Sequence, residues 1–438
     1  MDPLKTDVYN LERVAHEFGT PLFAFSGDAI RERVAEFRGA FGMEWPRFEL
    51  MPSLKACPIL GVRVLLSELQ CGCDVFGPGE FEGALRCNVP PSRISLNGSI
   101  KDEQILRKAI LLGVRIVIDS PREASLINEI ATSVSSTAFV MLRLKPDLGE
   151  LSATSDFAPD LLISELSQRI KYGIPNSELT EIVDAWSSYS QLKLVGFHSH
   201  MGRHSKRLEV WSAWAAAVAS QVVEIESLLA DVDHPVINIG GGFASDLDAD
   251  LDVVDRSGNT PSLPEFASVI CAALRDKLSS SVIHWSDWTL EIEPGRGLHS
   301  DAGIHLTTVK NLKCETVGEH RRWAEVDTSE VFLDLHGVPD ECPLQFTSVS
   351  SASSSRHYRY DVVGLTCNAE MLSLDAELPE LAVGDVLAIY PTGAYLEPMA
   401  ANFNALPRPG SVLLDQGAVR LIKRHETVDD VFARDIIE

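Results

Sequence analysis

The sequence lacks the features of several large classes of protein. Basic residues are in the minority, with 38 Lys and Arg against 63 Asp and Glu, so the formal net charge is -25 at pH 7. This balance argues against nucleic acid and anionic membranes as partners, because both attract a basic face. No uninterrupted apolar run is long enough to span a bilayer. The first residues show no basic region followed by an apolar core, which argues against a signal peptide.

Cysteines are few and scattered, at 8 in 438 residues. Cys71 and Cys73 are too close together for an ordinary metal pair, and no second pair with matching spacing follows. Most of the cysteines lie in apolar surroundings. We therefore predict buried thiols in a reducing, cytoplasmic compartment, and no metal site.

Short apolar runs do alternate with segments of helical period. The runs end near Lys55, near Asp74, at Ile94–Asn97, Ile116–Asp119, Val140–Arg143, Leu194–His200, Val236–Gly242 and Leu290–Arg296. Helical stretches between them include 79–86, 102–112, 123–131 and 211–229. Roughly eight such β-α units predict a TIM-type (β/α)8 barrel, a fold of about 250 residues. An open, doubly wound sheet is the alternative, and it would place a ligand at one crevice.

Polar residues follow nearly every one of these runs, namely Lys55, Asp74, Asn97, Asp119, Arg143, His198, His200, three glycines and Glu293. In a barrel the carboxyl ends of the strands form one mouth, so these residues would converge there. The simpler explanation is that polar residues begin wherever strands end. That explanation accounts for any one of these residues, but it accounts less well for polar residues after nearly every strand.

Beyond about residue 300, helical periods give way to short alternating runs separated by turns. The runs are 303–309, 331–335, 360–365, 386–390, 412–414 and 418–422. They predict an all-β, Greek-key-like second domain, and Pro21–Phe25 predicts a strand that joins it. We assign residues 28–302 to the barrel, and residues 1–27 and 303–438 to the β domain. The Ser-rich stretch 348–355 is expected to be a loop.

One lysine, Lys55, stands where the first apolar run of the barrel ends, in the stretch FELMPSLKACP at 48–58. A lysine in a dry pocket can lose its proton readily and attack a carbonyl. Lysines at strand ends are more often solvated surface residues, so this signal is weak alone.

Two later loops suit a phosphate group. Gly240, Gly241 and Gly242 would let backbone N–H groups approach an anion, with the start of the next helix adding its dipole. Gly295 and Arg296 follow the last strand of the barrel, and phosphate sites are common after strands seven and eight. A tight turn is the plainer explanation of the three glycines.

A lysine nucleophile, a phosphate cradle and a carboxylate, Glu293, together suggest pyridoxal 5'-phosphate. Lys55 would bind the aldehyde, Glu293 would keep the pyridine nitrogen protonated, and His200 would stack on the ring. His198 and His200 as a metal pair is the alternative, but no further ligands stand at suitable spacing.

With these residues, the chain resembles the fold-type III decarboxylases that use pyridoxal phosphate. This family contains the diaminopimelate, ornithine and arginine decarboxylases, and the chain is most similar to the diaminopimelate branch. The shared motifs are SLKAC, CDVFGPGE, KYGI, GFHSHMG, NIGGGF, EPGR, GLTCN and GAYLEPMAANFN, which cover nearly the whole chain.

The resemblance implies a homodimer with shared active sites and gives roles to individual residues. Lys55, Cys367 and His200 would be catalytic, with Cys367 coming from the partner subunit to help protonate the product. Asp74 and Tyr395 would join Lys55, His200, Glu293 and the glycine loops in holding the cofactor. Arg296, Asn368 and Tyr395 would contact the substrate.

The chain departs from this pattern at the far end of the substrate. Asn368 stands where the family has an acidic residue for a distal ammonium, and the segment 326–346 lacks the Arg and Tyr that bind a distal carboxylate. Arg203, followed by His204 and Ser205, replaces a Ser beside the phosphate. Glu370 is a candidate for the acidic residue that would bind a distal ammonium in place of Asn368.

We therefore expect a decarboxylase that removes the α-carboxylate of an amino-acid-like substrate, related to diaminopimelate or conjugated. A citryl-diamino acid of a siderophore or other secondary pathway is an example, with Arg203 or His336 meeting its acidic end. The alternatives are a diaminopimelate decarboxylase of lysine biosynthesis, an amino acid racemase and an inactive regulatory homologue. Racemases of this fold usually pair the pyridine nitrogen with Arg, so Glu293 argues against that alternative. The intact lysine and phosphate cradle argue against the regulator.

Overall fold

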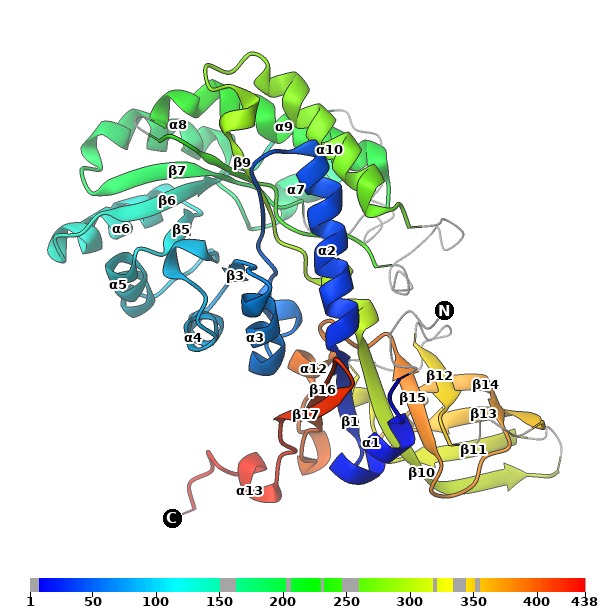
Figure 1. Ribbon diagram of the computed structural model, residues 1–438. Helices are drawn as coiled ribbons and strands as arrows, with labels where there is room; N and C mark the ends of the chain where they lie inside the picture. Colours follow the sequence, from blue (N-terminus) through cyan, green and yellow to red (C-terminus); the bar gives the residue numbers. More distant parts are fainter. Residues whose placement is uncertain are drawn as a thin grey trace.

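The computed structural model describes residues 8–149, 163–201, 206–229, 232–245, 260–317, 321–333, 344–350 and 355–437. Two sheets organise these residues, an eight-stranded parallel sheet with helices around it and a nine-stranded sheet below it (Figure 1). None of the described helices is long and apolar enough to cross a membrane.

The parallel sheet forms the predicted (β/α)8 barrel. Its strands are β2 (Phe48–Leu50), β3 (Cys73–Val75), β4 (Ile94–Leu96), β5 (Arg115–Ile118), β6 (Ala138–Arg143), β7 (Leu192–His198), β8 (Val236–Asn238) and β9 (Thr289–Ile292). They pair in the order β2-β9-β8-β7-β6-β5-β4-β3. A parallel bridge between Ser53, just past β2, and Asp74 in β3 connects the two remaining edges. The barrel is therefore nearly closed, and the open-sheet alternative is wrong.

Helices cover the outside of the barrel. They are α2 (Gly27–Glu44), α3 (Leu60–Glu68), α4 (Pro78–Arg86), α5 (Glu103–Leu112), α6 (Pro121–Ser133), α7 (Ile163–Arg169), α8 (Asn176–Ala185), α9 (Leu208–Ile225), α10 (Leu263–Leu278) and α11 (Arg296–His299). Local sequence sets several of their ends. Asp102 caps α5 by accepting a bond from the Ile105 N–H, and Gly113 ends that helix in the left-handed conformation.

The second sheet belongs to a mostly-β domain, as predicted. Its strands are β1 (Leu22–Ser26), β10 (Gly303–Glu315), β11 (Arg321–Val326), β12 (Gln345–Ser348), β13 (His357–Val363), β14 (Ser373–Pro379), β15 (Val386–Tyr390), β16 (Gly410–Asp415) and β17 (Ala418–Lys423). Three short helices accompany it, namely α1 (Leu11–Phe18), α12 (Leu396–Met399) and α13 (Val428–Val431). Strand β1 pairs with β10 and β16, and the domain boundaries at residues 28 and 303 stay a proposal.

Two details of the β domain differ from the sequence prediction. The run 331–335 is not a strand where it is described, because Glu330–Phe332 forms a 3-10 turn that Ser329 caps. Strands β11, β12 and β14 were missed, since their polar, partly exposed residues carry little of the apolar signal that marks a strand. In the predicted loop 348–355, Ser348 ends β12, and residues 351–354 lie outside the described part.

An aromatic cluster fixes the glycine loop after β8 against the helices. The Phe243 ring lies 4.7 Å from Trp211 of α9, 5.6 Å from Phe37 of α2 and 5.7 Å from Phe266 of α10, measured between ring centroids. Aromatic pairs at such distances stabilise a core beyond the area they bury. Gly240–Gly242, directly before Phe243, are therefore held in a defined place.

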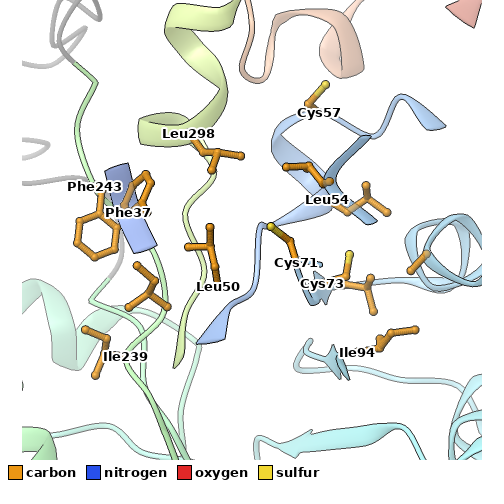
Figure 2. Close-up of a cluster of buried hydrophobic side chains, with 14 of the residues drawn as sticks. Phe37, Leu50, Leu54, Cys57, Cys71, Cys73, Ile94, Ile239, Phe243 and Leu298 are labelled. Carbon is orange, nitrogen blue, oxygen red and sulfur yellow. The ribbon is translucent and has the colours of Figure 1, made fainter. Parts of the chain in front are cut away.

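The cysteines are largely core residues. Figure 2 shows Cys57, Cys71 and Cys73 among buried apolar side chains, including Leu50 and Ile94. Among the described cysteines five are buried, and Cys314 and Cys367 are exposed. Burial raises the pKa of Cys57 and of Cys73 to about 12. The prediction of buried thiols is confirmed for these five.

Candidate active site

The carboxyl ends of the barrel strands surround a cavity of about 230 Å³. It is lined by Lys55, Asp74, Phe76, Asn97, Arg143, Ile170, Tyr172, His198, His200 and Glu293. Most polar residues of the predicted ring thus lie together. Asp119 stands behind this wall, with its Oδ1 3.8 Å from Arg143 Nε and accepting a 2.8 Å bond from the Gly173 N–H.

Lys55 stands in a single 3-10 turn, Leu54–Ala56, that follows β2. Its Nζ donates to Ser53 Oγ at 2.5 Å and to Asp74 Oδ2 at 3.1 Å. Burial opposes the charge of the amine, but the attraction of nearby charges, Asp74 foremost, raises the pKa of Lys55 above its ordinary value. The expectation of an easily lost proton is therefore wrong for the cofactor-free chain, in which Lys55 is an ammonium.

Glu293 is buried at the end of β9 and held by three side chains. Its Oε1 accepts from Asn238 Nδ2 at 2.8 Å and from Asn97 Nδ2 at 3.4 Å. Its Oε2 lies 3.2 Å from His198 Nε2. Amide N–H groups can only donate, so the Glu293 oxygens accept in both bonds. The Glu293 carboxyl group is therefore fixed in orientation at the cavity.

A second carboxylate, Glu291, lies two residues earlier on the same face of β9. Its two oxygens accept from Arg115 at 2.7 and 3.1 Å, in a buried bidentate pair. Asn238 bridges the two carboxylates, since its Nδ2 also lies 3.2 Å from Glu291 Oε2. Arg115 neutralises Glu291, which leaves Glu293 as the carboxylate that faces the cavity.

His200 lines the cavity opposite a glycine. Burial, together with the charges of Lys55 and Arg143, holds the pKa of His200 well below its usual range, so the imidazole is neutral. A Cβ on Gly240 would lie 2.8 Å from the His200 Cβ, and Gly240 has a φ of +71°. Only glycine lets the backbone approach His200 so closely in this conformation.

Close approaches also explain the other glycines. A Cβ on Gly241 would lie 2.2 Å from the Glu293 carbonyl oxygen, and one on Gly295 would lie 3.0 Å from the Tyr395 hydroxyl. The Tyr395 N–H bonds to the Ala56 carbonyl at 2.8 Å, and the Arg296 guanidinium lies 4.9 Å from the Tyr395 ring centroid. The glycine loops, Tyr395 and the Lys55 turn thus meet at one side of the mouth.

Among the residues that the structure describes, no long helix begins at the glycine loops to supply the predicted dipole. In the described part of the chain, the first helix after Gly242 is α10, which begins at Leu263. The helix after Gly295 has only four residues. An anion at these loops would therefore depend on backbone N–H groups and on Arg296, rather than on the dipole of a long helix.

Cys367 and Asn368 lie in the β domain and do not line the cavity of their own chain. Both are exposed. The Cys367 N–H bonds to Asn404 Oδ1 at 3.0 Å, and Asn368 Nδ2 donates to Glu330 Oε1 at 2.8 Å. Asn368 is thus held by a carboxylate, although it carries no charge itself.

Glu370 does not stand open to a ligand. It is 4% exposed, and its carboxylate bonds to the hydroxyls of Ser329 and Thr366 and to the Glu330 N–H at 3.4 Å. Burial raises its pKa. These hydrogen bonds hold Glu370 in the interior of the β domain. The geometry therefore gives no support to the hypothesis that Glu370 replaces the acidic residue that the family has at position 368. Arg203, His204, Ser205 and His336 lie outside the described residues.

The sequence reading missed several residues of the site. Ser53, Asn238 and Tyr172 each contact a residue of the cavity wall, Lys55, Glu293 and Arg143 respectively. Asn238 ends β8, with one residue between it and the glycines, so its strand-end position was the available signal. Ser53 begins the SLKAC motif, but its residue type gave no further signal, because one serine in an apolar run is typical of an ordinary turn.

The residues present fit pyridoxal phosphate. A lysine amine, a fixed carboxylate and a neutral imidazole line one cavity, and the glycine positions leave no room for a side chain. Two buried atoms of the wall, His198 Nδ1 and Asn97 Oδ1, have no hydrogen-bond partner among the described residues. Nowhere in that part of the chain are three or more His, Cys, Asp or Glu side chains grouped to hold a metal ion.

Known proteins with similar sequences are diaminopimelate decarboxylases. That of Aquifex aeolicus is 28% identical over 429 residues, which cover 96% of this chain and 92% of that protein. That of Methanothermobacter thermautotrophicus is 29% identical over 425 residues, which cover 95% and 92%.

The fold agrees with these sequences. The crystal structure of diaminopimelate decarboxylase from M. jannaschii has a TM-score of 0.85 at 27% identity, covering 98% of this chain and 94% of that chain. A structure of that enzyme with L-lysine has a TM-score of 0.84 at 26% identity, with the same coverage. A family model described as "Pyridoxal-dependent decarboxylase, pyridoxal binding domain" matches residues 27–300, the barrel with its cavity. The chain therefore belongs to the pyridoxal-dependent decarboxylase family.

Proposed function

We propose that this decarboxylase removes the α-carboxylate of an amino acid whose side chain ends in a neutral group that donates hydrogen bonds. The observation that carries the proposal is the environment of Asn368. Its Nδ2 donates to Glu330, so its Oδ1 points away from that carboxylate as an acceptor. The alternative is decarboxylation of diaminopimelate, which the relatives named above favour.

The charges around Asn368 support a neutral partner. Asn368 is exposed in the single chain. A partner subunit that covered it would enclose an ammonium there without a paired carboxylate, at a cost on the order of several kcal/mol. Glu330 is 8% exposed and already bonded to Asn368, and Glu370 is enclosed by hydroxyl groups. The relatives reported above are named for diaminopimelate and none for a citryl or other siderophore conjugate, so the proposal specifies only a neutral end of the side chain.

The cavity residues have separate tasks in this proposal. Pyridoxal phosphate, when bound, supplies an electron sink for the bond to the departing carboxylate. Lys55 would anchor it, Glu293 would hold its ring nitrogen, and His200 would cover its ring. The glycine loops, Arg296 and Tyr395 would bind its phosphate, and Arg296 and Tyr395 would also contact the substrate. Asp74 holds the Lys55 amine in reach, at 3.1 Å.

We predict that the enzyme discriminates against charged side-chain ends. Nε-acetyl-lysine and Nδ-acetylornithine should be decarboxylated with a kcat/KM at least about tenfold above that of lysine, ornithine and diaminopimelate, since about 1.4 kcal/mol suffices for that factor. The measurement is carbon dioxide release over this panel. Asn368→Glu should shift the preference toward lysine. Turnover of diaminopimelate at about 10⁴ M⁻¹s⁻¹ or more, ordinary for an enzyme on its own substrate, would establish the alternative.

We also propose a homodimer in which each subunit gives Cys367 to the cavity of the other. Cys367 is exposed, and it is absent from the cavity wall of its own chain. An exposed thiol on the β domain is available to a second subunit, and there it would donate a proton to the product. Location in the cytoplasm stays a prediction that the five buried thiols support.

Subunit exchange tests the shared site. Lys55→Ala and Cys367→Ala chains should each be impaired, and a mixture should regain about a quarter of the wild-type activity if exchange is complete, because random pairing gives half heterodimers with one intact site each. Mass measurement of differently tagged subunits verifies the exchange. Heterodimers without recovered activity would show that each chain builds its own site.

A further inference from the structure

Ser53 forms a closed triangle with Lys55 and Asp74 at the edge of the barrel. Lys55 Nζ donates to Ser53 Oγ at 2.5 Å and to Asp74 Oδ2 at 3.1 Å, and Ser53 Oγ donates to the same Asp74 oxygen at 2.5 Å. Ser53 is 1% exposed and Asp74 is 2% exposed. The Ser53–Asp74 contact is therefore shielded from water, while the Lys55 side chain, 37% exposed, reaches this contact from the cavity side.

The protons of the triangle can be assigned. The single hydroxyl proton of Ser53 is used on Asp74, because an ionised carboxylate can only accept. The Ser53 oxygen must then accept from Lys55. Two protons of the Lys55 ammonium are thus directed, one to Ser53 and one to Asp74. This arrangement suits a lysine that is free and charged, and a lysine whose nitrogen is bonded to an aldehyde carbon has too few protons to complete it.

The backbone holds Ser53 in this position independently of Lys55. The Ser53 N–H bonds to the Pro294 carbonyl at 3.2 Å, next to Glu293, and Ser53 pairs with Asp74 in the bridge that connects the barrel edges. Asp74 is fixed in turn, since Asn97 Nδ2 donates to its Oδ1 at 2.7 Å. Ser53 and Asp74 are thus held in position by contacts that do not involve the Lys55 amine.

We propose that Ser53 is a positioning residue that docks the ammonium of Lys55 whenever Lys55 is not bonded to the cofactor. This rests on the proposed function, and it adds that the substrate amine would take the place of Lys55 on the cofactor. The bond that Lys55 loses at its nitrogen would be replaced by one at the substrate nitrogen, and the protons that the substrate ammonium gives up would complete the Lys55 ammonium. No further reactant is needed. Docking keeps the released ammonium beside the cavity, as a proton donor for the carbon that has lost its carboxylate.

The first test uses cofactor-free protein. Labelling by acetic anhydride over a range of pH, read by peptide mass spectrometry, gives the pKa of the Lys55 amine. The titratable groups that act on it are Asp74, Tyr395 and Glu293. Ser53→Ala should lower this pKa by about one unit, which is about a tenfold faster reaction below the pKa. Ser53→Thr, which keeps the hydroxyl, should stay within about twofold of wild type.

Ser95→Ala is the matched control. Ser95 is buried in β4 directly opposite Asp74, but its hydroxyl has no partner among the described residues. Its loss should leave Lys55 unchanged. If Ser53→Ala does not fold by circular dichroism, Ser53→Cys, with a weaker acceptor of similar size, should shift the pKa in the same direction.

The second test uses holoenzyme and the amine product. Spectroscopic titration measures how far the amine displaces Lys55, and Ser53→Ala should weaken displacement about tenfold while Ser53→Thr does not. An unchanged Lys55 pKa together with unchanged displacement would overturn the docking role. The labelling needs neither cofactor nor turnover, so its result stands even if the proposed substrate is wrong.

Discussion

Lys55→Ala should abolish both the visible absorbance of the bound cofactor and the decarboxylase activity. The cavity places the Lys55 amine among the residues that fit pyridoxal phosphate, and it is the one lysine in the wall. Loss of a group that acts by covalent catalysis should lower turnover by about three orders of magnitude or more. Absorbance spectra of the dialysed proteins and carbon dioxide release measure the two effects.

Two variants separate the amine from its charge. Lys55→Arg keeps a cation beside Asp74, and it should remain as inactive as Lys55→Ala. Lys108→Ala removes a half-exposed lysine that pairs with Glu82 on the outside of the barrel, and it should leave both the spectrum and the activity unchanged. A Lys55→Ala protein that keeps its visible band after dialysis would show that another amine anchors the cofactor.

Glu293→Gln should lower turnover by about 10²–10³-fold, the scale for removing one fixed partner of a charge that develops in the reaction. Asn97, Asn238 and His198 hold the carboxylate within hydrogen-bond distance. The replacement keeps the shape but removes the negative charge. Steady-state kinetics and the affinity for pyridoxal phosphate measure the loss.

Glu291→Gln is the control on the same strand. Its side chain faces Arg115 instead of the cavity wall, so the variant should lose stability while the folded enzyme keeps turnover within a few-fold. A cofactor analogue with CH in place of the ring nitrogen gives a second comparison. With it, Glu293→Gln and wild type should bind equally, and an equal loss with both cofactors would refute a contact between Glu293 and the ring nitrogen.

The sequence predicted the barrel well because the physical signal repeats. Each apolar run is short, is buried on both faces and is followed by a helical period, as in β4 and α5. Since parallel strands end on one side, the polar residues after them lie around one cavity. In the β domain, strands such as β14 are half exposed, and one face of alternating residues gives a weaker pattern.

The site was less predictable than the fold because its chemistry depends on contacts between side chains that come from different strands. Ser53 matters through two bonds, to Lys55 and to Asp74, and the second joins residues 21 positions apart. The protonation of Lys55 depends on Asp74 and Glu293, which come from other strands. Likewise, the enclosure of Glu370 follows from Ser329 and Thr366. The amino-acid sequence alone does not give these distances between residues that are far apart along the chain.

The position of β1 has a consequence for how the chain is made. Leu22 of β1 pairs with Leu306 of β10 on one side and with Gly410 of β16 on the other (Figure 1). The strand that is synthesised first can therefore complete its pairing only after β10 and β16 have been synthesised. The barrel, from α2 to β9, is synthesised in between and can form first, since domains generally fold as units during synthesis. Its folding brings β1 close to β10, which shortens the loop that must close. A chain that stops before β16 would leave one edge of β1 unpaired, and such an edge favours aggregation.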